Sequence, residues 1–286
     1  MSHEIPTPRA PLTVDAHQHF WSYTPADFGW ISDDMAAIRR DFTPTDLAPL
    51  LQQSGIDRTV AVQARQSIEE TTWLLSLAAE NDWIAGVVGW LPLADANIQP
   101  LLDEASANPK LKGLRHILQA EPDAFMLRDD FNAGISLLRR YGLTYDVLVL
   151  EHQLPAAIEF VDRHPSQPFV LDHLAKPLIA AAALEPWRSN LIELARRPHV
   201  SCKLSGLVTE ADFRAWSPAD LRPYMETALE AFGPQRLLFG SDWPVCTVAA
   251  TYTRWLQVVN EFIARLSPHE QQAILGGNAA SFYKLN

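Results

Sequence analysis

The stretch Thr-Val-Asp-Ala-His-Gln-His at residues 13–19 has the pattern of a short strand that ends in polar side chains. Side chains two positions apart on a strand face the same side, so His17 and His19 can reach one point in space. Two imidazoles with this spacing suit a metal ion, or a carbonyl group and the oxyanion formed from it. Two packed histidines would show the same spacing, so the pair alone leaves both interpretations open.

Seven further short runs rich in Val, Ile and Leu follow along the chain, and amphipathic stretches separate them. These runs occupy residues 58–63, 84–91, 111–117, 144–150, 168–173, 200–205 and 237–242. Alternation of strands and helices predicts a parallel sheet, and eight such units in about 250 residues predict a (β/α)₈ TIM barrel. A doubly wound sheet is the rival fold, but the sequence has neither G-x-G-x-x-G nor G-x-x-x-x-G-K-[ST].

The stretches between the runs predict helices whose ends carry recognisable signals. A glycine ends two of them, Gly55 and Gly142, and the helix before Gly142 begins with acidic residues and finishes with two arginines. The predicted helices span residues 45–54, 69–81, 129–141, 154–163, 186–197, 219–232, 252–266, 268–275 and 278–283. No linker or shift in composition interrupts this pattern. We therefore expect one domain over residues 1–286, with an N-terminal tail at 1–12.

Composition narrows the class of protein. The 286 residues contain 23 Lys and Arg against 34 Asp and Glu, which gives a net charge of −11. A chain this acidic is a poor binder of nucleic acids or anionic membranes. An apolar content of 48% argues against disorder, and no apolar run reaches the roughly 20 residues of a membrane-spanning helix. The first 13 residues resemble neither a signal peptide nor an anchor, so we expect a cytoplasmic protein with two unpaired cysteines. Composition leaves the oligomeric state open.

Polar side chains gather at the C-terminal ends of the predicted strands. They are Asp15, His17, His19, Gln63, Arg65, Arg115, His116, Asp172, His173, Lys176, Lys203, Ser205, Ser241, Asp242 and Trp243. In a barrel these strand ends open on one face, which is where such enzymes carry out their chemistry. The convergence predicts an enzyme, because a purely structural protein has no need to collect these groups at one end of its sheet.

Asp242 follows the apolar run Leu-Leu-Phe-Gly-Ser, and a carboxylate at the end of a buried strand is costly unless it is paired. It could bind an imidazole, ligate a metal or take a proton from water, and capping a helix is the structural alternative. Arg115 and His116 could bind a polar substrate or pair with carboxylates. Cys246 could line a pocket near Asp242, whereas we expect Cys202 to be packed in the interior.

Five segments in their order along the chain resemble the amidohydrolase superfamily, and within it the amidohydrolase-2 branch and its sugar-lactonase group. The segments are Val-Asp-Ala-His-Gln-His-Phe-Trp at 14–21, Gly-Leu-Arg-His at 113–116, Leu-Asp-His-Leu-Ala-Lys-Pro at 171–177, Cys-Lys-Leu-Ser-Gly at 202–206 and Phe-Gly-Ser-Asp-Trp-Pro at 239–244. The resemblance implies a (β/α)₈ barrel that hydrolyses a lactone at the C-terminal face of its strands. The lactone would be L-fuconolactone, L-rhamnonolactone or a related sugar lactone, and the cations Arg65, Arg115 and Lys176 would equally accept a dicarboxylate such as 2-pyrone-4,6-dicarboxylate.

The resemblance also implies roles for individual residues. It equates His17 and His19 with the superfamily's first-strand histidine pair, His173 with its sixth-strand histidine and Asp242 with its eighth-strand aspartate. The fourth strand ends in Arg115-His116-Ile117 and lacks the lysine that bridges two metals in many members, and His152 is the nearest candidate for a fifth-strand ligand. This implies at most one divalent metal, such as Zn²⁺, which catalysis does not necessarily need. Its ligands would be His17, His19 and Asp242, joined by His173 or His152.

For lactone hydrolysis we expect Asp242 to be the general base and His17, His19 and His173 to stabilise the oxyanion, directly or through Zn²⁺. The expected substrate-binding residues are Arg65, Arg115, His116, Lys176, Trp21 and Trp243. Aromatic residues between positions 20 and 30 would cover the barrel mouth and pack on a sugar ring. Two alternatives remain: a metal-dependent decarboxylase of the same branch, and a non-catalytic protein that binds sugar acids.

Overall fold

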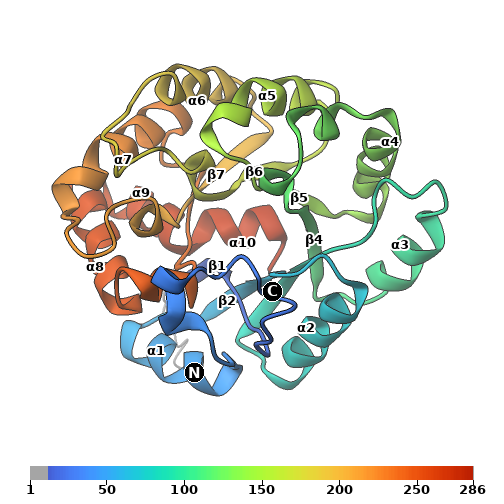
Figure 1. The fold of residues 1–286 in the computed structure, drawn as a ribbon, viewed down its shortest axis with the longest axis horizontal. Coiled ribbons are helices and arrows are strands. Elements are labelled where there is room, and N and C mark those ends of the chain that lie inside the picture. Colours follow the sequence, from blue (N-terminus) through green and yellow to red (C-terminus); the bar gives the residue numbers. More distant parts are fainter. Residues whose placement is uncertain (1–11, 286) are drawn as a thin grey trace, which may run out of the picture.

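A computed structural model describes residues 12–285 and shows eight parallel strands in the order of the sequence, surrounded by helices (Figure 1). The strands are β1 (Val14–Gln18), β2 (Arg58–Val62), β3 (Ile84–Gly89), β4 (Leu111–His116), β5 (Thr144–Val147), β6 (Phe169–Leu171), β7 (Val200–Leu204) and β8 (Leu237–Phe239). All eight lie within the runs predicted from the sequence, and the (β/α)₈ barrel is confirmed. The predicted tail at 1–12 lies, apart from Leu12, outside the described residues.

The α-helices cover the outside of the barrel and one of its ends. They are α1 (Pro44–Ser54), α2 (Ile68–Glu80), α3 (Gln99–Ser106), α4 (Asp129–Leu138), α5 (Leu154–Asp162), α6 (Trp187–Ala195), α7 (Pro218–Phe232), α8 (Tyr252–Ile263), α9 (Pro268–Gln272) and α10 (Asn278–Tyr283). The sequence did not predict α3, which has eight residues and only one fully buried side chain, Leu102. Its apolar pattern is therefore too short to show helical periodicity.

The first and last strands meet and bring the barrel close to closure. The backbone N–H of His19 donates to the Trp243 carbonyl at 2.7 Å, and that of Asp242 donates to the His17 carbonyl at 2.7 Å. The buried Asp15 carboxylate accepts a further bond from the Ser241 N–H at 2.8 Å. These bonds fix the C-terminal end of β1 directly beside the loop that carries Asp242.

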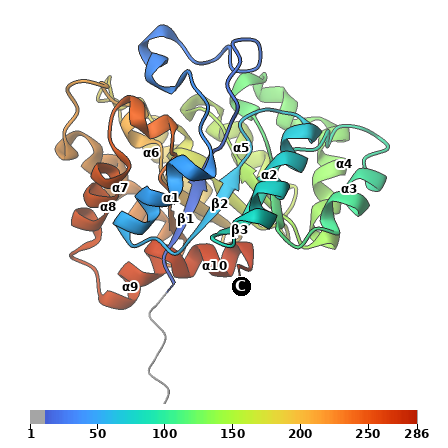
Figure 2. The same ribbon diagram turned by 90° about the horizontal axis from the view of Figure 1, so that it is seen from below.

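Helix α10 closes one end of the barrel, and the other end is open. A cluster inside the barrel consists of small and branched side chains from the strands together with Ala279 and Tyr283 of α10. Figure 2 shows α10 lying across one end of the sheet, while the long connection between β1 and α1 rises from the opposite end. The α10 end is the N-terminal end of the strands. Its closure leaves the C-terminal ends as the open face.

Candidate active site

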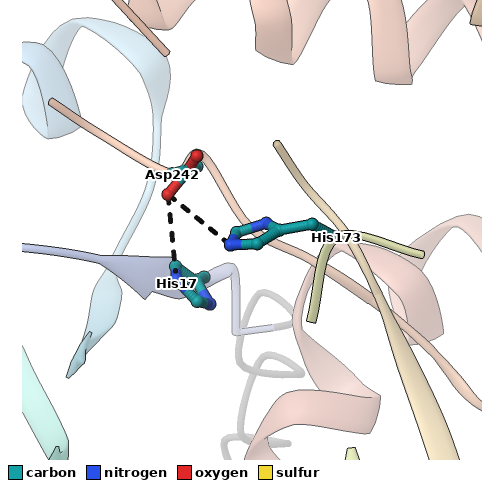
Figure 3. A group of neighbouring side chains, drawn as sticks. All are labelled: His17, His173 and Asp242. Atoms are coloured by element: carbon teal, nitrogen blue, oxygen red, sulfur yellow. Dashed lines mark ion pairs between the residues drawn. The ribbon is translucent and has the colours of Figure 1, made fainter. Parts of the chain in front are cut away.

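The side chains of His17, His173 and Asp242 converge at the C-terminal ends of β1, β6 and β8 (Figure 3). The Asp242 Oδ1 atom lies 3.7 Å from His17 Nε2, 3.8 Å from His173 Nε2 and 3.3 Å from His19 Nε2. All four residues are at least 90% buried. The sequence predicted each of them as a site residue, and the structure places three imidazoles around one carboxylate.

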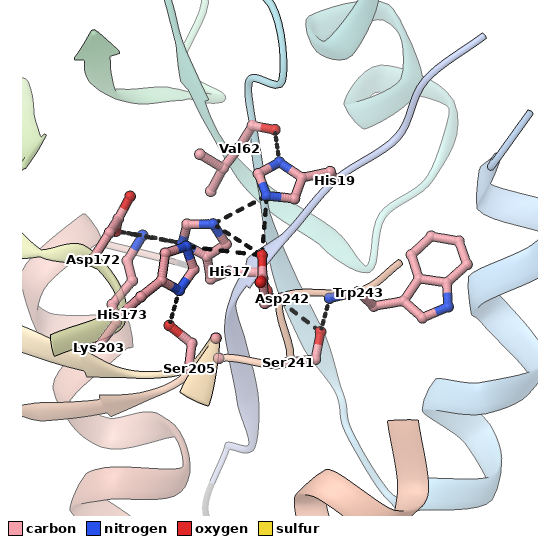
Figure 4. Close-up of polar contacts among 12 residues, drawn as sticks. His17, His19, Val62, Asp172, His173, Lys203, Ser205, Ser241, Asp242 and Trp243 are labelled. Atoms are coloured by element: carbon pink, nitrogen blue, oxygen red, sulfur yellow. Dashed lines mark hydrogen bonds and ion pairs between the residues drawn. The ribbon is translucent and has the colours of Figure 1, made fainter. Parts of the chain in front are cut away.

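Neighbouring groups hold two of these rings in place (Figure 4). His19 Nδ1 lies 2.8 Å from the Val62 carbonyl, so it carries the proton of the neutral ring and leaves a lone pair on Nε2. His173 Nδ1 lies 2.9 Å from the Ser205 hydroxyl. A hydroxyl both donates and accepts, so His173 can present either an N–H or a lone pair to the site.

The backbone that carries His173 and Asp242 is unusual. His173 and the next three residues have φ values between 50° and 58°, and Asp242 has φ 56°. Residues other than glycine adopt this left-handed backbone conformation at a cost of about 1–2 kcal/mol each. Strain of this kind persists where the surrounding structure enforces it, and it gathers at functional sites. Both residues are among the site residues predicted from the sequence.

The electrostatics of the cluster favour an ionised Asp242 beside the neutral rings of His17 and His173. Burial lowers the pKa of His173 to about 4, although the charges of Asp242 and Asp172 act in the opposite direction. Burial and the charge of Lys203 hold the pKa of His17 well below its usual range. Burial acts to raise the pKa of Asp242, but the electrostatic effect of the surrounding imidazoles, that of His173 above all, outweighs it and keeps that pKa below its ordinary value.

A cavity of about 380 Å³ opens above the cluster. Side chains from most of the strand ends and from the β1–α1 connection line it. The lining residues are His19, Trp21, Trp30, Met35, Ala64, Arg115, Ile117, Gln119, Ala120, Leu148, His173, Lys176, Thr209, Glu210, Phe213, Asp242 and Val245. His17 is fully buried and is not among them, so it lies behind the residues that face the cavity.

The cations predicted to bind substrate are each paired with a carboxylate. Arg115 Nη1 donates to Asp172 Oδ2 at 3.0 Å, and Lys176 Nζ lies 3.5 Å from Glu210 Oε1. Both cations line the cavity. Arg65 is not among the lining residues.

Arg65 instead joins the β1–α1 connection to α2. Its guanidinium lies 3.1 Å from Asp27 Oδ2 and 3.6 Å from Glu70 Oε1. Asp27 belongs to the aromatic connection, so this bridge holds the connection beside the cavity.

Three other predicted residues lie away from the cavity lining. His116 is buried, receives a hydrogen bond from Trp90 Nε1 at 3.2 Å and stacks on Phe125. Trp243 is buried against Phe20 and Phe42.

The side chain of His152 is 57% exposed, and its ring nitrogens face Glu151 and Asp123. The structure therefore does not bring this histidine to the cluster. The two cysteines are buried and unpaired, and neither lines the cavity.

The aromatic residues of the β1–α1 connection form a wall of the cavity. Trp21 is 1% exposed and packs edge-on against Trp30, with ring centroids 6.1 Å apart. Trp30 is 45% exposed and lies at the mouth of the cavity. Phe28 and Phe42 support Trp21 from behind.

A charged layer that sequence reasoning did not assign lies beneath the histidines. Lys203, Asp146 and Asp172 are all fully buried, and Lys203 forms ion pairs with both aspartates. Tyr283 of α10 donates to Asp146 at 2.8 Å. A lysine inside the otherwise apolar run of β7 was the available signal, but nothing in the sequence identified its partners.

The ligand atoms that the cluster offers are of the kinds that bind a metal ion. His17, His173 and Asp242 each offer one ligand atom, and these atoms lie within 4.8 Å of one another. Two imidazoles and a carboxylate form a set that zinc accepts, and they leave a position for water or substrate. The lone pair on His19 Nε2 lies on the same side of the site. The residues therefore fit a single divalent metal.

Comparisons with known proteins agree with this architecture. The family model described as Amidohydrolase matches residues 14–285. An L-fucono-1,5-lactonase of Burkholderia multivorans is 46% identical over 96% of both chains, and one of Burkholderia ambifaria is 39% identical over the same share. A crystal structure of a Burkholderia multivorans amidohydrolase with bound zinc superposes with a TM-score of 0.93, at 44% identity, over 96% of this chain and 100% of the other. The chain belongs to the amidohydrolase family.

Proposed function

We propose that this chain is an enzyme that hydrolyses a sugar lactone of the L-fucono-1,5-lactone type. The observation that carries the proposal is the Asp242 carboxylate, which faces a cavity of about 380 Å³ and is surrounded by three imidazoles. Two relatives of nearly the same length are L-fucono-1,5-lactonases, and their 46% and 39% identity supports the same reaction class.

In the proposed reaction Asp242 takes a proton from a water molecule as that water attacks the lactone carbonyl carbon. A general base contributes on the order of 10²–10⁴ in rate. Arg115 and His173 line the cavity beside Asp242 and carry the N–H groups available to the developing oxyanion. When the C–O bond of the ring breaks, the proton on Asp242 passes to the ring oxygen. The product is an open hydroxy acid.

A divalent metal bound by His17, His173 and Asp242 would polarise the lactone carbonyl as a Lewis acid. The chain's own residues already supply a base and hydrogen-bond donors. We therefore propose that metal adds to the reaction and that some activity remains without it.

The charges around the cavity favour a neutral lactone over a dicarboxylate. Asp172 neutralises Arg115, and Glu210 neutralises Lys176, so Asp242 contributes an additional negative charge. A substrate with two carboxylates would be repelled by Asp242 and would find no unpaired cation among the described lining residues. The Lys176–Glu210 pair instead offers both donors and acceptors, which suits sugar hydroxyls, and Trp21 and Trp30 offer an apolar face for the ring.

Side-by-side rates on three compounds test the proposal. L-fucono-1,5-lactone, 2-pyrone-4,6-dicarboxylate and an aromatic carboxylic acid are each incubated with the protein, and acid release and carbon dioxide release are followed. Rapid acid release from the sugar lactone is the expected result. A strong preference for the dicarboxylate would contradict the sugar assignment, carbon dioxide release would indicate a decarboxylase, and binding without turnover would indicate a sugar-acid binding protein.

A further inference from the structure

Residues 20–42 form most of the connection between β1 and α1 and bring three side chains to the cavity: Trp21, Trp30 and Met35. Figure 2 shows this connection, in blue, projecting from the open end of the barrel. The position of the three side chains relative to the strand ends therefore depends on the contacts that attach the connection to the barrel.

The polar contacts of residues 20–42 stay almost entirely within the connection or reach the adjoining helix α1. Trp21 and Phe42 exchange two backbone hydrogen bonds of 3.0 and 2.9 Å, and Trp21 Nε1 donates to the Arg40 carbonyl at 2.8 Å. In the part of the chain that the structure describes, one ion pair alone joins these residues to another element. It is the pair of Arg65 Nη1 with Asp27 Oδ2, at 3.1 Å.

Apolar packing holds the two ends of the connection rather than its middle. Phe20 and Phe42 both pack edge-on against Trp243, with ring centroids 6.1 and 5.3 Å apart. The short helix at Asp33–Ile38 lies beside the one at Val245–Val248. Asp27 lies between these contacts, close to the tryptophans that line the cavity.

Glu70 of α2 fixes Arg65 on the barrel side. Its side chain is 1% exposed, and its Oε2 atom accepts the backbone N–H groups of Ala64 and Arg65 at 3.0 and 2.7 Å. Its Oε1 atom lies 3.6 Å from Arg65 Nε, and neither atom has a hydrogen-bond partner among the described residues. On the other side, Asp27 Oδ2 also accepts from Thr24 Oγ1 at 2.9 Å. Both partners of the ion pair are therefore oriented before they meet.

The Arg65–Asp27 pair lies outside the cavity lining and is partly exposed. The exposed fractions of the two side chains are 31% and 40%. Ion pairs with this exposure are weak, so the pair can separate while the fold persists. Arg65 is thus placed to act on the connection rather than on a molecule in the cavity.

We propose that Arg65 is a positioning residue that attaches the connection to the barrel through Asp27 and so holds Trp21 and Trp30 where the substrate ring packs. Molecules in which the connection is detached lack this wall of the cavity, so the apparent affinity follows the attached fraction. The effect on substrate affinity rests on the proposed function, whereas the attachment of the connection does not.

The first test needs no substrate. Tryptophan is replaced by fluorotryptophan, and the fluorine signals of Trp21 and Trp30 are assigned by their loss in Trp21→Phe and Trp30→Phe. The difference in chemical shift between light and heavy water reports contact with solvent. In Asp27→Asn we expect the Trp21 signal to become sensitive to solvent, because the ion pair is lost while the side-chain shape is kept.

Asp33→Asn is the matched control. It removes an ion pair of 2.8 Å with Arg39 that lies within the same connection and does not reach the barrel. The Trp21 signal of this variant should stay as in the wild type. A Trp21 signal that is unchanged in Asp27→Asn, or that changes equally in both variants, would overturn the inference.

The second test measures KM and kcat on L-fucono-1,5-lactone for Asp27→Asn, Arg65→Gln and the double variant. Each single change should raise KM about 2–5-fold and leave kcat nearly unchanged, because the pair is partly exposed and the base is untouched. The double variant should have no higher KM than the weaker-binding single variant, since both changes remove the same contact. A KM that rises by the product of the two single effects would show that Arg65 acts independently of Asp27 and would overturn the inference.

The two proposals fail in different ways. A solvent-sensitive Trp21 in Asp27→Asn, in a protein without lactonase activity, would remove the proposed function and keep the role of Arg65. An active lactonase whose Trp21 signal and KM are both unchanged in Asp27→Asn would do the reverse.

Discussion

The ring of His173 packs directly against the backbone of Gly206, so closely that a Cβ atom on this glycine would lie 2.4 Å from His173 Nδ1. Gly206 also has φ +68°, a conformation that other residues adopt only at a cost. The glycine therefore sets the position of the imidazole that faces Asp242. Gly206 contributes to the site by leaving room for the His173 ring, and it supplies no chemical group of its own.

We predict that Gly206→Ala lowers both kcat and the free energy of unfolding. Gly55→Ala is the matched control, because Gly55 has φ +66° but nothing within 4 Å of its Cβ position. The free energy of unfolding of the control should fall by about 1–2 kcal/mol, which is the cost of the left-handed conformation, and its activity should be unchanged. Urea unfolding and initial rates measure the two effects. Equal losses of stability with unchanged activity in both variants would show that the contact with His173 does not matter.

Asp242→Asn should abolish turnover while the fold persists. The amide has nearly the same shape as the carboxylate but cannot accept the proton of the attacking water, so kcat should fall on the order of 10²–10⁴. Circular dichroism and the melting temperature verify the fold, and a pH indicator follows lactone opening. A near-normal kcat in this variant would remove Asp242 from the role of base.

Exhaustive chelation should lower activity without abolishing it. Elemental analysis of the untreated protein should find at most one zinc per chain, because the structure offers one cluster of two imidazoles and a carboxylate among residues 12–285. Rates before and after chelation, and after zinc is added back, measure the share of catalysis that depends on metal. Complete loss on chelation with full recovery on zinc addition would make the metal essential, and two tightly bound zinc ions would contradict the single site.

The acid limb of kcat/KM should lie near pH 4. Burial lowers the pKa of His173 from 6.5 to about 4, so the ring stays neutral until the solution is quite acidic. Protonation then places a cation 3.8 Å from Asp242 and weakens it as a base. A limb near pH 6.5 would show that the ring has the pKa of an ordinary histidine.

The same shift has a defined effect on stability. Between pH 6.5 and 4 the unfolded chain binds more protons than the folded one, so the contribution of His173 to stability falls as the pH drops. The dependence of the urea midpoint on pH, with His173→Asn as the control, measures it. A midpoint whose pH dependence is the same in the wild type and in the variant would contradict the assignment.

The barrel was predictable because its strands are buried on both sides and appear as short apolar runs. The boundaries were less so: β6 and β8 end at Leu171 and Phe239, two and three residues earlier than predicted, because the chain leaves the sheet to direct His173 and Asp242 into the site. Helix α3 has too few apolar residues for its period to show.

The sequence also located the residues that cluster around Asp242, because strand ends meet on one face of a barrel. It did not separate side chains that face the cavity from those that turn away. Trp243 follows Asp242 directly, yet its ring packs behind the cavity against Phe20 and Phe42. The partners of Lys203 come from β5 and from the turn after β6, and only the folded chain brings them together.

The bond between the Asp15 carboxylate and the Ser241 N–H joins residues that are 226 positions apart. This contact places Asp242 beside the two histidines of β1, so the site exists only after the last strand has docked against the first. Contacts at such separation form late, because the entropy of closing a long loop must be lost first. During refolding, enzymatic activity should therefore return with the slowest phase, after most of the helical signal has already recovered.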